Sequence, residues 1–245
     1  GLSGLVSCRL LFQTALTQPT KLPANIASLT DSALLDLVQH QTFRYFWDYA
    51  HPVSGMARER SNESFGYGAD VVTTGGTGFG IMAVIVATER KWITRDTAAK
   101  FLLKLVNFLL NANAYHGVFP HWLHGVTGQT IPFSRKDDGA DLVETSYLMQ
   151  GLLCARAYFD RDSAEELRLR QRISYLWEEV EWNWYTQGGR TVLTWHWSPT
   201  NGFALNHDIR GWNECLITYV LAASAPRYGI PAQAYHEGFT QGRQF

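Results

Sequence analysis

Residues 137–153 read DDGADLVETSYLMQGLL, and an apolar continuation reaches Phe159. Asp141 and Glu144 are three positions apart, so on a helix they share one face within the first turn. The residues that follow are apolar on nearly every side of such a helix, and a helix that is hydrophobic all round is buried. The stretch therefore predicts a buried helix over residues 140–159 with two carboxylates at its N-terminal end.

The same acids have a simpler interpretation as helix caps. Acidic side chains in a first turn suit the helix dipole and the free N–H groups there, which is the usual reason for a single acid at that place. The run holds four acids, Asp137, Asp138, Asp141 and Glu144, which is more than capping requires. The cluster by itself leaves both a functional site and a cap open.

Composition sets the broad class. The chain has 245 residues, enough for one large domain with a substantial core. Its 21 Lys and Arg against 22 Asp and Glu give a formal net charge of -1, which argues against a general nucleic-acid binder. Aromatic residues make up 13% of the chain, with nine Trp, and this favours a surface that stacks on sugars or other flat ligands.

The cysteines and the apolar runs exclude several other classes. The three cysteines, Cys8, Cys154 and Cys215, form no CxxC pair, so neither a structural zinc site nor a disulfide framework is indicated. No apolar run approaches about 18 residues without charge, so no membrane span is predicted. The histidines lack a trustworthy zinc-ligand spacing, and no cofactor motif is found, so neither a metal nor a cofactor is expected.

The N-terminus suggests export. Residues 5–8, LVSC, resemble a bacterial lipoprotein cleavage box, which would make Cys8 a lipid anchor. We expect residues 1–28 to be an N-terminal extension or the remnant of an export signal, and residues 29–245 to form the domain. The expected location is periplasmic or secreted.

Hydrophobic periodicity predicts six helices in an alternating pattern. They cover residues 31–49, 75–89, 94–112, 140–159, 163–180 and 211–223. Charged amphipathic helices alternate with apolar ones, long aromatic links enter the apolar helices, and short links leave them. Gly75, Gly76, Gly78 and Gly80 fit close helix packing better than a phosphate loop, because no GxGxxG follows a strand.

This alternation predicts a ring of helical hairpins, with apolar helices inside and amphipathic helices outside. The long links and the first turns of the apolar helices then lie at one end, which brings Asp141, Glu144 and Glu214 together with His and Trp side chains. Carboxylates beside aromatic platforms are what glycoside hydrolysis requires. Sugar contact is expected of Trp122, Trp195, Trp197 and Trp212, whereas Trp47, Trp177 and Trp182 are expected in the core.

Six segments resemble the bacterial glucoamylase-like family, whose characterised relatives include endo-β-1,2-glucanases. They are 43–47 (FRYFW), 78–83 (GFGIMA), 119–122 (FPHW), 138–145 (DGADLVET), 195–199 (WHWSP) and 210–214 (RGWNE). The resemblance runs from about residue 29 to residue 238 in the right order. It implies an all-α fold, the (α/α)6 toroid, with an inverting hydrolytic mechanism and export from the cell.

The resemblance also implies roles for individual residues. Glu214 matches the best candidate for the general acid. Asp138, Asp141 and Glu144 match the acidic motif of the pocket and are expected to position substrate or water, with a catalytic role for Asp141 or Glu144. The expected substrate-binding residues are Asp138, Arg60, His121, Trp122, Trp195, Trp197 and Trp212.

The chain departs from the family in one respect, because the toroid needs twelve helices and about six are found. We therefore expect the N-terminal half only, without the carboxylate that opposes Glu214, and weak or no hydrolysis by this chain alone. An open half-ring would expose apolar helices and favour association. Two alternatives to a glucan-acting hydrolase stay open: a non-catalytic carbohydrate-binding or assembly module, and a helical scaffold that binds no glycan.

Overall fold

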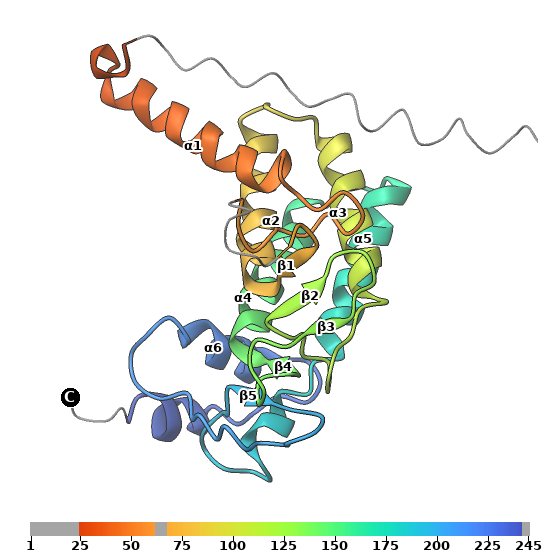
Figure 1. The fold of residues 1–245 in the computed structure, drawn as a ribbon, viewed down its shortest axis with the longest axis vertical. Helices are drawn as coiled ribbons and strands as arrows, with labels where there is room; N and C mark the ends of the chain where they lie inside the picture. The colour runs from red at the N-terminus through yellow and green to blue at the C-terminus, as the bar shows by residue number, and fades with distance from the viewer. Residues whose placement is uncertain (1–24, 62–67, 242–245) are drawn as a thin grey trace, which may run out of the picture.

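The computed structural model describes residues 25–61 and 68–241. The predicted anchor Cys8 lies outside these residues. Six α-helices carry the described fold, as the sequence predicts (Figure 1). They are α1 (Asp31–Trp47), α2 (Thr74–Glu89), α3 (Arg95–Leu109), α4 (Leu142–Tyr158), α5 (Ala164–Glu178) and α6 (Leu216–Ser224), with short helical turns η1 (Ile26–Ser28), η3 (Trp182–Thr186) and η4 (Tyr235–Phe239).

Side-chain caps fix where three of the outer helices begin. Thr30, Thr94 and Ser163 each accept a hydrogen bond from the backbone N–H three residues later, at the starts of α1, α3 and α5. Each such cap stabilises its helix by about 1 kcal/mol. At the start of α5, Ser163 Oγ accepts a 3.3 Å hydrogen bond from Glu166 N.

Helices α2 and α4 form the centre of the core, and glycines let their backbones touch. A Cβ added at Gly78 would lie 2.1 Å from the carbonyl oxygen of Tyr147, and one at Gly151 would lie 2.4 Å from the carbonyl oxygen of Gly78. The close-packing interpretation of the glycines is therefore confirmed at Gly78. Helix α3 packs on α5, and α6 packs on α4.

We predict that Gly78→Ala destabilises the chain by about 3 kcal/mol or more, because overpacking against a backbone atom forces two helices apart. The measurement is urea unfolding followed by circular dichroism. Gly80→Ala is the matched control on the same helix, since its Cβ would meet the movable Phe46 ring at 2.9 Å. Equal losses for the two variants would contradict the close-contact interpretation.

The described fold is an open arrangement of hairpins. Helix α1 extends away from the other helices (Figure 1), and Phe43 is its one buried residue. Apolar side chains on the predicted inner helices are exposed, among them Phe79 (56%) on α2 and Val220 (50%) on α6. As expected of an open half-ring, α2 and α6 therefore expose part of their apolar surface, because no described element covers these faces.

Two small sheets that the sequence analysis treats as loops lie where the inner helices begin. Strands β1 (Val71–Thr73), β2 (Trp122–His124) and β3 (Thr130–Ile131) pair antiparallel in that order. Strand β4 (Ala140–Asp141) pairs antiparallel with β5 (His196–Trp197), with Asp141 opposite His196 and Ala140 opposite Trp197. Both β1 and β4 run directly into an inner helix, so the sheets lie at the predicted site.

Helix α6 begins at Leu216, later than the predicted residue 211. Gly211 has φ 81°, a left-handed conformation outside the helical region. Asn213 Oδ1 then accepts a hydrogen bond from Cys215 N, which makes a turn before the helix. Glu214 therefore lies in this turn and not in the first turn of a helix.

Among the described residues, no helix is both long and apolar enough to cross a bilayer.

Candidate functional site

Asp141 is the hub of the acidic cluster. It is 1% exposed and caps α4, with Oδ1 accepting hydrogen bonds from Val143 N at 3.1 Å and Glu144 N at 3.0 Å. The same oxygen accepts a 2.8 Å hydrogen bond from Trp195 Nε1, and Oδ2 lies 3.1 Å from His121 Nδ1. Asp141 therefore caps α4 and, with the same carboxylate, binds the side chains of Trp195 and His121.

His196 reaches the same carboxylate from the neighbouring strand. The β4–β5 register sets His196 opposite Asp141, with Nε2 3.8 Å from Asp141 Oδ2 and 3.6 Å from Asp137 Oδ2. The ring stacks on Trp195 at 5.6 Å, and burial lowers the pKa of His196. His196 is not among the predicted site residues, because the β4–β5 pairing that brings it to Asp141 has no local signal in the sequence, and Asp137 is predicted only as part of the acidic run.

Asp137 is a carboxyl group that burial makes weakly acidic. It is 7% exposed, and burial together with the charge of Asp141 raises its pKa to about 6. A carboxyl group with a pKa near the working pH can both donate and accept protons or hydrogen bonds.

We predict a pH-dependent stabilisation on replacing Asp137 by asparagine. The folded-state pKa of Asp137 lies above its ordinary value. The free energy of unfolding of the wild-type chain therefore falls by up to about 3 kcal/mol as pH rises from about 4 to about 6. Asp137→Asn should therefore raise the free energy of unfolding at pH 7.5, with little change at pH 4. Urea unfolding at both pH values checks this, with exposed Asp162→Asn as the control. An equal effect at both pH values would contradict it.

Glu144 lies between α4 and the start of α2. Its Oε2 accepts a 2.8 Å hydrogen bond from Gly75 N, and a Cβ at Gly75 would meet that oxygen at 2.4 Å. Burial and then the charge of Asp141 raise the pKa of Glu144. Burial alone would lower the pKa of His121, but its hydrogen bond to Asp141 and the nearby carboxylates outweigh this and raise it.

A second group of predicted residues adjoins this cluster. Trp122 Nε1 donates to Glu59 Oε2 at 3.2 Å, and Arg60 Nη2 lies 2.7 Å from Glu59 Oε1. The Trp122 ring packs against His121 at 5.7 Å. Arg60, His121 and Trp122 therefore come together as expected. Glu59, which holds two of them, was missed because a lone acid in a loop has no distinguishing pattern.

Glu214 lies at the same end of the molecule. Its backbone oxygen accepts a 3.1 Å hydrogen bond from Tyr147 Oη, and its side chain is on an exposed residue. Burial raises the pKa of Tyr147 to about 12, with further contributions from the nearby charges of Glu214, Glu144 and Asp141. Tyr147, on α4, thus lies between the predicted acid and the acidic cluster.

Three predicted binding residues make their hydrogen bonds or ring contacts with residues outside the cluster. Asp138 Oδ2 accepts a 2.7 Å hydrogen bond from Thr200 Oγ1 and so anchors the loop after β5. Trp197 points to the opposite side of β5 from His196, since alternate strand residues face opposite sides. Trp212 is 67% exposed and packs edge-on against Phe239. The predicted core positions of Trp177 and Trp182 are confirmed, at 6% and 0% exposed.

Within the described ranges, Asp137, Asp141 and His196 have potential ligand atoms within 4.8 Å of one another. Both oxygens of Asp141 already accept hydrogen bonds, from backbone N–H groups, Trp195 and His121. This donor set favours hydrogen bonding to a polar ligand over a tight cation site. The sequence predicts no metal site, because the spacing of these three residues matches no ligand pattern.

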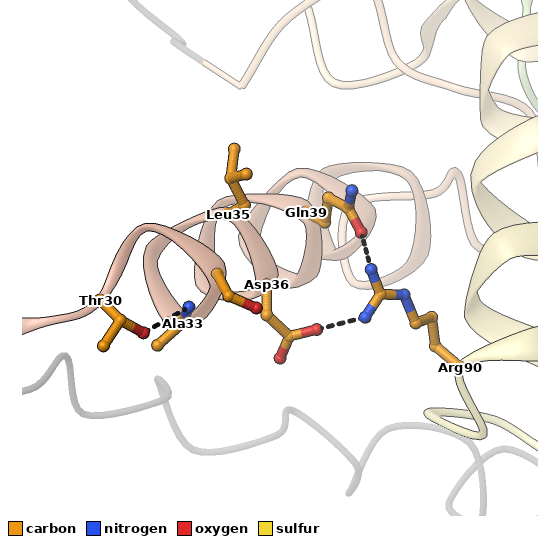
Figure 2. A pocket seen from close by; sticks show the side chains of 7 residues that line it. Thr30, Ala33, Leu35, Asp36, Gln39 and Arg90 are labelled. Atoms are coloured by element: carbon orange, nitrogen blue, oxygen red, sulfur yellow. Dashed lines mark hydrogen bonds and ion pairs between the residues drawn. The ribbon is translucent and has the colours of Figure 1, made fainter.

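A hollow at the other end of α2 is a weaker candidate. It has a volume of about 570 Å³ and lies between α1 and Arg90 (Figure 2). Arg90 Nη1 lies 2.7 Å from Asp36 Oδ1, and Arg90 Nη2 donates to Gln39 Oε1 at 2.7 Å, so its polar groups bind one another. The cluster around Asp141 is therefore the candidate site.

Comparisons with known proteins agree with the resemblance. No protein-family model matches the chain. The exo β-1,2-glucooligosaccharide sophorohydrolase of Parabacteroides distasonis is 44% identical over 219 residues, which is 89% of this chain and 30% of that protein. The endo-β-1,2-glucanase of Chitinophaga pinensis, solved with sophorotriose and glucose, is 49% identical with a TM-score of 0.84, covering 86% of this chain and 51% of that one.

A candidate glucoamylase from Bacteroides uniformis is 54% identical with a TM-score of 0.83, covering 86% of this chain and 50% of that one. The chain therefore spans about half the length of these solved relatives and 30% of the curated one. The predicted relationship and the helical toroid fold, present in part, are confirmed.

Proposed function

We propose that this chain, a relative of glucoamylase-like and β-1,2-glucan-hydrolysing proteins, carries the substrate-binding and general-acid part of a glycoside hydrolase. Its substrate is β-1,2-glucan or a related glucoside, cleaved with inversion. The Asp141-centred cluster carries the proposal, because it gathers buried carboxylates, imidazoles and indoles at one end of a helical scaffold. Such groups supply both hydrogen bonds to hydroxyls and flat surfaces for sugar rings.

The residues have separate roles in this proposal. Glu214, exposed in the turn before α6, protonates the leaving glycosidic oxygen. Glu144 accepts hydrogen bonds from sugar hydroxyls, and Asp141 fixes the rings of His121 and Trp195. The base that activates water comes from the part of the relatives' length that this chain does not span. Residues 29–245 act as one domain.

Titration with sophorotriose and maltotriose, followed by product analysis, tests the function. We expect sophorotriose to bind more tightly and to yield product slowly. Trp122→Phe, which removes the hydrogen bond to Glu59, should weaken binding about tenfold, a loss of about 1.4 kcal/mol. Tyr175→Ala on the exposed side of α5 is the control. Binding without product would favour the carbohydrate-binding module, and no binding would favour the scaffold.

The partners and the location follow from the same proposal. The uncovered apolar faces, including Phe79 on α2 and Val220 on α6, favour association of the open half-ring. Sedimentation velocity should show a mass that rises with concentration, and a constant monomer mass would contradict association.

Cell fractionation should place the protein in the periplasm or outside the cell, whereas a cytoplasmic pool would contradict export.

A further inference from the structure

A hollow outside the acidic cluster carries two exposed aromatic rings. It has a volume of about 480 Å³ and lies between η3 and the segment that follows α6. Trp184 and Tyr228 line it and are 40% and 39% exposed. Glu181 and Asn183 line it as well, so polar side chains accompany the rings. We call this hollow the Trp184 pocket.

His116 covers one face of the Trp184 indole and holds it in place. The indole stacks on His116 with ring centres 3.8 Å apart and planes within 15°. His116 Nδ1 lies 3.0 Å from Glu181 Oε2, and its ring meets Trp197 edge-on at 5.1 Å. One face of the indole is thus covered by a braced imidazole. A ligand that stacks on Trp184 therefore meets a surface whose side-chain entropy is already lost.

Tyr228 is braced independently. The Arg227 guanidinium lies 5.0 Å from the centre of the Tyr228 ring, and Arg227 Nη2 donates to Tyr228 Oη at 3.0 Å. The backbone of Tyr228 has φ 54°, an uncommon conformation for an aromatic residue, and its carbonyl accepts from Asn183 N at 2.9 Å. The surrounding contacts maintain this strained backbone, which sets the ring at the edge of the pocket.

Two glycines form an open rim. Gly188 and Gly189 have φ of 89° and 98°, and a Cβ at either would meet nothing within 4 Å. Gly189 N donates to Thr186 Oγ1 at 2.9 Å, which fixes the turn. Their left-handed backbone favours glycine, so this side of the pocket has no side chains that would hinder a bulky ring.

We propose that the Trp184 pocket is an auxiliary site for a short β-linked gluco-oligosaccharide. The apolar face of one glucose ring stacks on Trp184, Tyr228 contacts the same or the next ring, and Glu181 and Asn183 bind hydroxyl groups. Aromatic surfaces with a few polar groups are typical of such small-molecule sites. The choice of a glucan as ligand rests on the proposed function.

The Trp184 pocket and the acidic cluster are neighbours on different sides of one strand. In β5, His196 reaches the acids, whereas Trp197 reaches His116 and Trp184. Tyr185 lies buried between them, and its pKa is raised by burial and then by the charges of both Glu181 and Asp141. A glucan held at the Trp184 pocket would therefore raise the local concentration of chain ends near the acids.

Affinity electrophoresis and calorimetry with β-1,2-glucan and sophorotriose test the proposal on the whole chain. We expect Trp184→Ala to weaken glucan binding about tenfold. Tyr228→Asn should weaken it several-fold, because the variant removes the aromatic ring. Asparagine is used because it tolerates the left-handed backbone at this position. Tyr175→Ala is the control, and circular dichroism confirms folding of each variant. The same losses in glucan binding are expected when each pocket variant is combined with Glu144→Gln, a substitution in the acidic cluster.

The outcomes separate this inference from the proposed function. If Glu144→Gln weakens binding and both Trp184→Ala and Tyr228→Asn leave it unchanged, the auxiliary site is wrong and the proposed function stands. If the Trp184 pocket variants weaken binding and the wild type yields no product, the auxiliary site stands without the hydrolase. No binding of β-1,2-glucan by the wild type overturns both.

Discussion

Asp141→Ala is expected to lower the free energy of unfolding by about 3–5 kcal/mol, the largest stability effect that we predict. The substitution removes the cap of α4, the acceptor of Trp195 Nε1 and the carboxylate beside His121 at once. Because these groups are buried or half-buried, their unmet hydrogen bonds cannot be fully replaced by water. Urea unfolding at pH 7 measures the loss.

A matched control separates capping from the rest. Thr30→Ala removes only the exposed cap of α1, where Thr30 Oγ1 accepts from Ala33 N at 3.3 Å, and should cost about 1 kcal/mol. Asp141→Asn should fall between the two, since asparagine caps well but turns an amide group toward His121. If Asp141→Ala costs no more than Thr30→Ala, then Asp141 is a cap and nothing else.

Glu214→Gln is expected to reduce glucan turnover by about 10²–10⁴-fold, with less than about a twofold change in the binding constant for sophorotriose. The amide keeps the size of the side chain but cannot donate a proton to the leaving oxygen. Tyr147 contacts the backbone of Glu214, so the turn itself should be preserved. Product release measured by chromatography, together with calorimetric binding, separates the two effects.

Glu237→Gln is the matched control, because Glu237 is also exposed, in η4, and has no place in the proposed site. Its turnover should equal that of the wild type. Turnover by Glu214→Gln within a factor of about two of the wild type would exclude Glu214 as the general acid. A wild-type chain that binds sophorotriose and never releases product would leave the binding module as the function.

The acidic cluster contains most of the predicted site residues and some residues that were not predicted. Asp141, Glu144, His121, Trp122 and Trp195 were all proposed from the sequence, and the structure places them together. His196 and Glu59 were not proposed, and Asp137 was named only as part of the acidic run, although Asp137 and His196 lie close to Asp141 and Glu59 accepts a hydrogen bond from Trp122. They were missed because no helical spacing in the sequence relates them to their partners. For His196 and Glu59, these partners are also far away along the chain.

The amino-acid sequence by itself determined the helices and their alternation. Periodic apolar residues, capping side chains such as Ser163, and glycines such as Gly78 act over one or two helical turns, so a local pattern contains them. The motifs that resemble the glucoamylase-like family likewise predicted a relationship that the comparisons confirm.

Only the tertiary structure decided which side of the scaffold each loop side chain faces. The β4–β5 pair joins residues 55 and 57 positions apart through two residues per strand, too few to show a period in the sequence. Its register turns His196 toward Asp141 and Trp197 toward Trp184. Because neighbouring strand residues point to opposite faces, a long-range backbone pairing, and not the identity of either residue, assigned one to the acids and the other to the Trp184 pocket.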